Sequence, residues 1–385
     1  MNQIILVFKS YYRLLHSKWR RIPLLDRWLT IELLPPFLFA VSAFTIISLS
    51  LGAMFELIRQ IVESGLSISI ALQVLLLKLP GFLVLSFPMA VLMATLLSYS
   101  RLSANSEIKA LLSIGISLPR IILPAIFLGI FMTGATFMFN NIVVPNSNQM
   151  ADITLRRGLG ISMHSNHSED IVYSRKGDQG LSHLFYAKDF TDGEMNGVTL
   201  LDFTKIKYTQ ILRAKKALWN NTKGAWKFVD GNIHTISPNG ASTSVDFKTY
   251  NYPLDSGPKN IAELPQDSNN MTLSDAFKAQ RLYELSGNVK EARRMKVRIQ
   301  EKFTLPMACL VFSLIGSTLG IKPNIRTSQS QGFGLSIILI LIYYVLSFTF
   351  SSLGVSGALS PFISAWSPVF ISLLGGVYIL KRAMK

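Results

Sequence analysis

The sequence predicts an α-helical membrane protein with six transmembrane helices, arranged as three plus three, and an inserted all-β domain of jelly-roll-like fold. Hydrophobic residues make up 49% of the 385 residues and charged residues only 16%, a balance too apolar for an ordinary soluble protein of this length. The apolar residues gather in runs long enough to cross a bilayer. A long polar interval with a β-like pattern separates the first three runs from the last three.

Six apolar runs of about 18 residues or more can each cross a hydrocarbon core of roughly 30 Å. The second run is longer than one crossing requires, so we expect it to be tilted or to begin with an interfacial turn, and Pro80 and Pro88 can bend it. Basic residues precede the first run as in a secretion signal, but this run is too long for one and predicts an uncleaved span. The runs cover residues 35–55, 68–99, 118–144, 303–321, 333–350 and 361–380.

The distribution of charge predicts the topology. The net charge is +16. If the N-terminus is cytoplasmic, the segments on that side carry many lysines and arginines, and their only acids are Asp26, Glu32 and Glu107. This positive-inside bias places both termini and the segment 101–117 in the cytoplasm. An odd number of crossings then places the polar interval on the other side of the membrane.

The polar interval begins near residue 145 and has the pattern of β-strands. It contains alternating or β-branched runs such as "LSHLFYAKDF" and "AWKFVDGNIHTI", and turns with glycine such as "TDGEMNG" and "SPNGAS" separate them. Several short strands at this spacing predict a sandwich or a jelly roll. An open apolar concavity in such a sheet would hold acyl chains, and a plain packed sandwich is the alternative.

Two helical stretches follow the strands, "MTLSDAFKAQRLYEL" and "NVKEARRMKVRIQEKF". Ser274 and Asp275 can cap the first. In the second, basic residues recur every four positions and so share one helical face at the start of the fourth span. Such a stripe suits phosphate or carboxylate headgroups, and the alternative is a row of snorkelling anchors paired with nearby acids. The stripe consists of Lys290, Arg294, Arg298 and Lys302.

The sequence shows no catalytic or metal-binding constellation. The five histidines form no HxxxH or HExxH pattern, and His164 and His167 lack clear further ligands nearby. Cys309 is the only cysteine, which excludes a disulfide or a zinc cluster within the chain. There is also no GxxxxGK(S/T) motif. We therefore expect no enzyme and no cofactor in this chain; if ATP drives it, a second polypeptide brings the ATP and Mg²⁺.

The segment between the second and third spans, "RLSANSEIKALLSIGIS", predicts a short helix outside the bilayer. A serine or asparagine can cap it, Glu107 lies at its start, and Gly115 allows a turn before the next span. Leu111, Leu112 and Ile114 would be excess apolar surface for a free loop. We therefore expect the helix to fit a groove on another protein, and an amphipathic interfacial helix that only anchors the loop is the alternative.

Five stretches of the sequence resemble a known family. They are "LLDRWLTIELLPPF", "LPGFLVLSFPMAVLMATLLSYSRLSANSEIKALLSIGISLPRIILP", "IQEKFTLPMACLVFSLIGSTLGI" and "LIYYVLSF" with the following "LSPFISAWSPVF". With these stretches the chain resembles, over nearly its whole length, the LptF/LptG (YjgP/YjgQ) permeases of the lipopolysaccharide-export ABC transporter. The second stretch is the most specific, because it joins a proline-bearing span, a polar helix and a further proline-bearing span.

The resemblance implies a transport subunit, not an enzyme, in the bacterial inner membrane with its β domain in the periplasm. It would pair with a second permease copy or a paralogue, and a dimeric cytoplasmic ATPase would dock on the helix that contains Glu107. The first and fifth spans would form a lateral gate that extracts lipopolysaccharide or a related glycolipid from the outer leaflet. The β domain would pass the acyl chains to a periplasmic bridge protein of similar jelly-roll fold. A secondary transporter or a non-transport membrane scaffold is the alternative.

The resemblance also gives the expected site residues. For coupling to the ATPase they are Arg101, Glu107, Leu111, Leu112 and Gly115. Better-known members often carry a lysine or arginine for lipid phosphates near the outer end of the first span, but here Glu56 lies near that position and Arg59 follows one turn later. The expected lipid-binding residues are Arg59, Lys78, Arg294, Arg298 and Lys302. For Lys78, which lies one or two turns below the outer surface of the second span, the alternative is a side chain that snorkels to that surface.

The expected domains follow the polar interval. Residues 1–144 hold the N-terminal cytoplasmic segment and the first three spans, with the coupling helix at about 101–117. Residues 145–300 hold the β domain and the helical linker, and residues 301–385 hold the last three spans and the cytoplasmic C-terminus.

Overall fold

The computed structural model describes residues 23–159, 168–177, 180–191, 193–204, 209–220, 224–237, 242–254, 259, 270–285, 288–321 and 329–384. Three parts of the prediction lie outside the described residues. They are the N-terminal cytoplasmic segment before residue 23, the histidines His164 and His167, and Lys322 and Arg326, which belong to the basic residues expected on the cytoplasmic side. In the described part of the chain, six helices are long and apolar enough to cross a membrane. The protein is therefore a multi-pass membrane protein, and the predicted three-plus-three order around an inserted antiparallel sheet is confirmed.

Two of the spanning helices contain a π-helical segment. The first, Leu24–Ser64, consists of α2 (Leu24–Leu49), η1 (Ser50–Met54) and α3 (Phe55–Ser64). The third, Leu118–Gly158, consists of α6 (Leu118–Met138), η2 (Phe139–Val143) and α7 (Val144–Gly158). The other helices are α4 (Ile68–Ala104), α5 (Glu107–Ser113), α9 (Leu273–Leu285), α10 (Val289–Gly320), α11 (Gln329–Ser356) and α12 (Pro361–Ala383).

The helices are longer than the apolar runs. The first and third spanning helices continue to Ser64 and Gly158 as α3 and α7, whose polar residues a hydropathy pattern does not detect. The second, α4, is continuous through Pro80 and Pro88, because neighbouring helices in a membrane protein can satisfy the backbone groups that proline leaves unpaired.

The first turn of α9 begins differently from the prediction, since Thr272 and not Ser274 caps it. Thr272 Oγ1 accepts a hydrogen bond from Asp275 N at 3.2 Å and donates one to Asp275 Oδ2 at 2.8 Å. Thr272 thus satisfies one backbone amide of the first turn, and the Asp275 carboxylate holds its hydroxyl in place.

Helix α10 lies at the centre of the bundle and packs against α4, α6, α11 and α12. Glycines permit the close approach. A Cβ added at Gly316 would overlap Thr95 Oγ1, and one at Gly320 would lie 2.6 Å from Tyr99 Cβ. The hydrophobic effect contributes little to the association of helices in lipid. Small residues at such crossings stabilise the contact instead, because they allow dense van der Waals packing.

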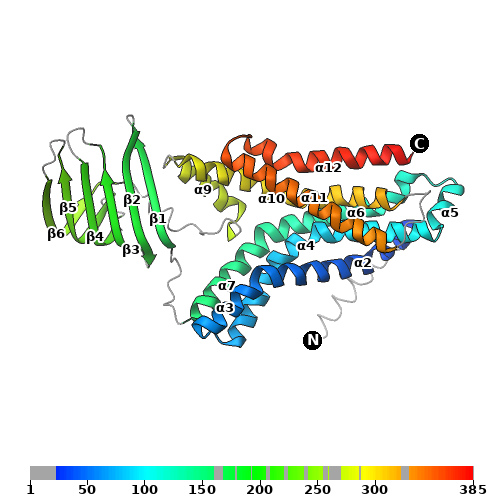
Figure 1. Ribbon diagram of the computed structural model, residues 1–385, viewed down its shortest axis with the longest axis horizontal. Helices are drawn as coiled ribbons and strands as arrows, with labels where there is room; N and C mark the ends of the chain where they lie inside the picture. The colour runs from blue at the N-terminus through cyan, green and yellow to red at the C-terminus, as the bar shows by residue number, and fades with distance from the viewer. Residues whose placement is uncertain are drawn as a thin grey trace, which may run out of the picture.

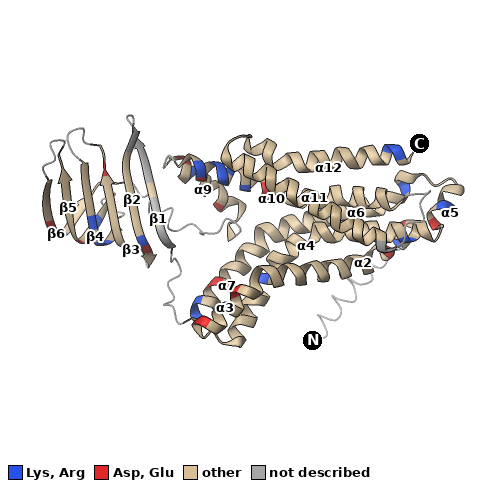
Figure 2. Ribbon diagram, in the orientation of Figure 1, with Lys and Arg blue, Asp and Glu red and all other residues tan. Residues whose placement is uncertain are grey.

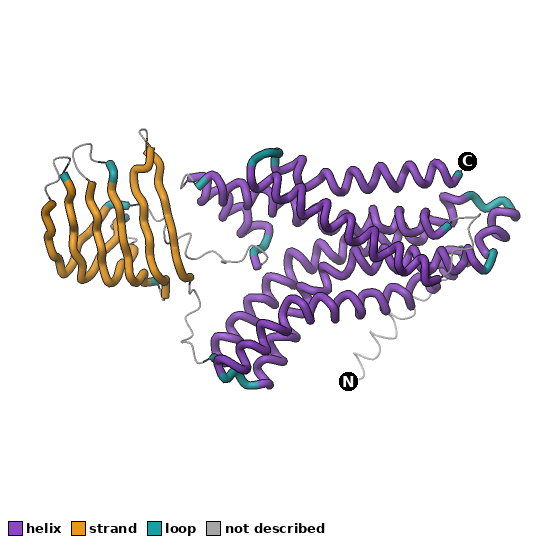
Figure 3. The backbone as a smooth tube through the Cα atoms, viewed as in Figure 1, coloured by secondary structure: helices purple, strands orange, loops and turns teal. Residues whose placement is uncertain are grey.

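The bundle has two distinct ends (Figure 1). Helix α5 lies at one end with the start of α2 and the end of α12, and we call this the α5 end. Helices α3, α7 and α9 lie toward the β-sheet, and we call this the sheet end. Helices α2 and α4 diverge from α11 and α12 toward the sheet end, as the tube in Figure 3 also shows. Charged residues are concentrated near the ends of the helices and sparse between them (Figure 2).

The inserted domain is a six-stranded antiparallel sheet in which each strand pairs with the next along the chain. This consecutive order is that of a meander, so the described strands do not confirm the Greek-key connections of a jelly roll. The strands are β1 (Ser168–Gly177), β2 (Gly180–Thr191), β3 (Glu194–Asp202), β4 (Thr209–Asn220), β5 (Ala225–Ile236) and β6 (Ser242–Tyr252).

The pairing of strands β2 to β6 is interrupted along one line, which we call the crease. Each pair skips one position on both strands and resumes in the same register. The sheet folds over there, because Phe185 of β2 contacts Trp226 of the non-adjacent β5 with ring centroids 5.4 Å apart. The domain core, with Phe185, Trp226 and Phe228 fully buried, lies inside this fold. The crease consists of Lys188, Gly197, Lys215, Asp230 and Lys248.

Candidate functional sites

Helix α5 begins after a two-residue turn that the end of α4 leads into. Ser106 is the N-cap residue with a positive φ of 63°, but its side chain makes no capping hydrogen bond. Asn105 Nδ2 donates instead to Glu107 Oε1 at 3.1 Å. The turn thus holds the carboxylate of Glu107 at the first turn of the helix, where a negative charge is favoured by the helix dipole.

The C-terminal end of α5 is fixed by Gly115. Its φ is +89°, a left-handed conformation that glycine adopts without strain. The amide of Gly115 donates to Leu112 O at 3.0 Å, and the amide of Ile116 donates to Leu111 O at 3.1 Å. These two bonds form a Schellman motif. The turn that was expected at Gly115 is present.

The apolar residues of α5 divide between the bundle and the surface. Ile108 is 1% exposed, and Leu111 and Leu112 are partly buried against the same core cluster of α2, α4 and α6. Ile114 is 73% exposed. The bundle itself therefore covers part of the two leucines, and Ile114 stays available as apolar surface.

Arg101 is not a free basic group at the surface. Its guanidinium pairs with the carboxylate of Glu32 in α2. On the other side of α5, Arg120 of α6 pairs with Asp26 of α2, with Nη1 2.7 Å from Oδ1 and Nη2 2.8 Å from Oδ2. A cytoplasmic partner that contacted Arg101 would have to compete with Glu32.

The predicted lipid-binding residues of the first and second spans lie near the sheet end. Arg59 Nη2 donates to Glu56 at 3.0 and 2.9 Å within α3, and its side chain is 62% exposed. Lys78 of α4 is partly buried. Glu56 thus neutralises the cation that stands nearest to the expected anion-binding position.

The basic stripe of α10 does not form one exposed row. Arg294 is exposed and lies 3.5 Å from Glu291, whereas Arg298 is partly buried and donates to Glu301 at 2.7 Å. Lys302 is only 8% exposed. The stripe therefore turns from the surface into the bundle, because neighbouring helices cover α10 more completely as it enters the bundle.

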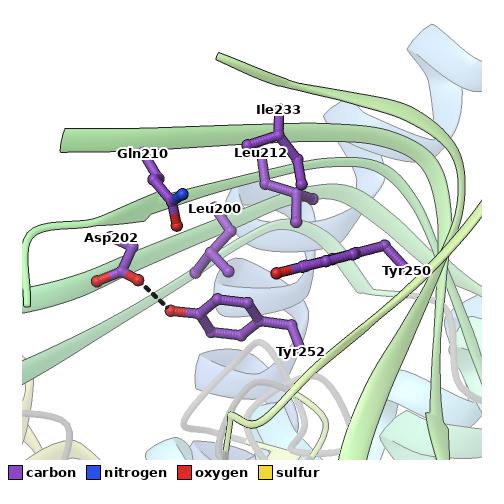
Figure 4. Close-up of a pocket in the computed structure, with 7 residues that line it drawn as sticks. All are labelled: Leu200, Asp202, Gln210, Leu212, Ile233, Tyr250 and Tyr252. Atoms are coloured by element: carbon purple, nitrogen blue, oxygen red, sulfur yellow. Dashed lines mark hydrogen bonds between the residues drawn. The ribbon is translucent and has the colours of Figure 1, made fainter. Parts of the chain in front are cut away.

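A hollow in the folded sheet contains both apolar and polar side chains (Figure 4). Its cavity volume is about 10 Å³, which is roughly the space that one water molecule needs. It is too small to enclose a glycolipid. The lining residues are Leu200, Asp202, Gln210, Leu212, Ile233, Tyr250 and Tyr252.

A buried polar cluster borders this hollow. Tyr252 Oη donates to Asp202 Oδ2 at 2.5 Å, and His183 Nε2 lies 3.0 Å from Tyr252 Oη. Burial opposes ionisation of Asp202, but hydrogen bonds from Thr204 and Tyr252 and the nearby His183 outweigh it and lower the pKa of Asp202. Burial and Asp202 raise the pKa of Tyr252, which stays a hydrogen-bond donor.

This cluster was not predicted from the sequence. Its members come from β2, β3 and β6, and the crease brings β6 across β2 and β3. No local pattern marks residues that meet only through such a fold. Among the described residues, no group of histidine, cysteine and acidic side chains suits a metal ion.

Comparison with protein families shows to which family the chain belongs. Residues 27–382 match the family described as "Lipopolysaccharide export system permease LptF/LptG". The chain belongs to this family. The match runs from the first spanning helix to the last, so it includes α5 and the sheet. A comparison with curated proteins finds no match.

Membership of the LptF/LptG family makes the chain a permease component of lipopolysaccharide export rather than a catalytic enzyme. The resemblance noted in the sequence is thereby confirmed. The roles of individual residues within this LptF/LptG permease stay predictions.

Proposed function

We propose that the chain is the membrane subunit of an ABC transporter that extracts lipopolysaccharide or a related glycolipid from the outer leaflet of the inner membrane and passes it to a periplasmic bridge. One observation carries the proposal: α5 and the folded sheet lie at opposite ends of the bundle. A cytoplasmic ATPase and a periplasmic bridge protein can therefore bind the same chain without competing for the same surface.

The α5 end suits a separate ATPase dimer that holds the ATP and Mg²⁺. Its surface offers Glu107 and the exposed side chains of Lys109, Ser113 and Ile114, while Ile108 fastens the helix to the bundle. A displacement of α5 by the ATPase would move the bundle with it, because the buried contacts of α5 resist displacement relative to the core.

The outer surfaces of α2 and α11 support a lipid path beside the bundle. Both helices expose apolar side chains, among them Phe39 and Ile46 of α2 and Leu341 and Phe348 of α11. In a membrane such surfaces face lipid or another apolar helix. A second permease copy or paralogue that faced them would enclose a lateral gate between the first and fifth spans.

The folded sheet supports transfer to a bridge protein. Strand β6 is an edge of the described sheet, and its side chains from Ser242 to Asn251 are nearly all exposed. An edge strand has unpaired backbone groups and can accept a further strand. A bridge protein of similar fold would extend the sheet there and continue its apolar interior.

Co-purification with the ATPase tests the proposal. Glu107→Lys is expected to abolish the complex, because reversing a charge at a protein interface costs several kcal/mol, on the order of 2–5. The measurement is the amount of ATPase retained with the detergent-solubilised chain. Glu63→Lys, the same change on exposed α3 at the sheet end, is the matched control and should retain the ATPase. A normal complex with the Glu107 variant would contradict docking at α5.

A further inference from the structure

Two ion pairs connect α2 to both sides of α5. Arg101 lies in the last turn of α4, just before α5, and pairs with Glu32. Arg120 lies in the first turn of α6, just after α5, and pairs with Asp26. The acids are six positions apart on α2, so α2 is held at two separate turns.

The Asp26–Arg120 pair has the geometry of a rigid connection. Arg120 Nη2 donates a hydrogen bond to Asp26 Oδ2 at 2.8 Å, and Arg120 Nη1 lies 2.7 Å from Oδ1. Only 14% of the Asp26 side chain is exposed. A charge-assisted hydrogen bond with a second close contact between the charged groups fixes orientation as well as distance. An apolar contact can slide by a small amount, whereas this pair must break a charge-assisted hydrogen bond to do so.

Other contacts make the same region one packed unit. Ser98 Oγ of α4 donates to the backbone oxygen of Glu32 at 3.2 Å, and Tyr99 Oη donates to Ile121 O of α6 at 2.8 Å. Leu29 and Leu33 of α2 are buried in the cluster that also contains Ile108 of α5. Helix α2 packs mainly against α4, so these bonds act where the apolar contacts already align the helices.

Helix α2 can carry a displacement to the other end of the molecule. With η1 and α3 it forms one helix, Leu24–Ser64, of 41 residues, or roughly 60 Å at 1.5 Å per residue. Its far end lies at the sheet end (Figure 1). A rotation imposed at Asp26 and Glu32 would therefore appear as a movement near Val62.

We propose that the Asp26–Arg120 and Glu32–Arg101 pairs form a double link through which α2 follows α5 when the ATPase moves it. The four side chains are positioning residues, since they touch neither nucleotide nor lipid. The inference rests on the proposed function, because it requires an ATPase that acts on α5.

Spin labels at the sheet end test the double link in the complete complex with the ATPase. The labelled positions are Val62→Cys, at the end of α2–α3, and Val289→Cys, at the start of α10, in a Cys309→Ala background. Both native side chains are exposed. The distance between the labels is measured without nucleotide and after trapping with ATP and vanadate. We expect trapping to shift this distance in the otherwise unmodified chain.

The Asp26→Asn/Glu32→Gln variant is expected to bind the ATPase and hydrolyse ATP while losing at least half of the shift. Glu56→Gln is the matched control, because its carboxylate pairs with Arg59 of the same helix and takes no part in either link, and it should keep the shift. The exchanged pair Glu32→Arg/Arg101→Glu should also keep the shift in distance, because it retains an ion pair between α2 and α4. This variant tests the link if the neutral variant does not fold.

Three results would overturn the inference. They are a full shift in the neutral variant, loss of the shift in a folded exchanged pair, and a functional complex whose unmodified α2 does not move upon trapping. A chain that binds no ATPase at all would instead contradict the proposed function, and the double link would fall with it.

Discussion

At the residue scale, the clearest energetic consequence concerns Asp202. It is buried, it accepts hydrogen bonds from Tyr252 and Thr204, and its pKa is lowered. A carboxylate whose folded-state pKa is depressed contributes stability that is present above its unfolded pKa and is lost as the pH falls through the folded value. The loss should therefore begin near the ordinary value of 3.8 and continue below it.

We predict that Asp202→Asn lowers the stability of the sheet domain at neutral pH by about 1.5–3 kcal/mol, the usual contribution of a hydrogen bond to a charged group. The variant should also lose less stability than the parent between pH 5 and about pH 2, because the parent loses the contribution of the Asp202 carboxylate in this range. Thermal unfolding of the solubilised chain, followed by tryptophan fluorescence, measures both effects. Asp246→Asn, on the exposed face of β6, is the control. Equal acid sensitivity in Asp202→Asn and the parent would refute the assignment.

Single residues also show where sequence reasoning ends. The turn at Gly115 was predictable, because a glycine after a short amphipathic run is a common helix end. The pairing of Arg101 with Glu32 was not, because their separation of 69 positions leaves no local pattern. The same holds for the burial of Lys302, which occupies a regular position in a stripe but lies where other helices cover α10.

At the scale of elements, contacts between α10 and its neighbours depend on small residues. We predict that Gly316→Ala destabilises the bundle by about 1–3 kcal/mol, the usual cost of overpacking. The added methyl group would overlap Thr95 Oγ1 and lie 2.9 Å from Leu92 O. The melting temperature of the solubilised chain should fall accordingly.

The control for this prediction is Gly334→Ala on α11. A Cβ there meets no heavy atom within 4 Å, and alanine favours helix more than glycine does. Its melting temperature should be unchanged or slightly higher. If both variants melt alike, close packing at Gly316 is not what holds α4 against α10.

The secondary-structure elements that the sequence predicted best are those that must be apolar because they cross the bilayer. All six spans follow from hydropathy, because a bilayer requires long apolar helices. Polar α7 and the amphipathic α3 were missed as continuations of the spans, since their support comes from neighbouring helices. The strands were predictable from alternation and turns, but the crease was not. Of its residues only Gly197 is a typical breaker of strands.

At the scale of the whole molecule, the separation of α5 from the sheet predicts opposite accessibility. Ser113 of α5 and Ser244 of β6 are both exposed. In a Cys309→Ser background, a membrane-impermeant maleimide should label Ser244→Cys in cells whose outer membrane has been opened. It should label Ser113→Cys only after lysis. Labelling of Ser113→Cys in unlysed cells would exclude a cytoplasmic ATPase as the partner of α5.

The crease sets how the β domain can change shape. Because five neighbouring strands turn at one shared line without any slip in register, no strand can alter its bend alone. The crease divides the sheet into two halves. The angle between these halves must therefore widen or narrow for all five strands together. An acyl chain that entered between the two halves at β2 would therefore change the bend of β6 as well. The β6 edge would change shape before a partner protein bound there.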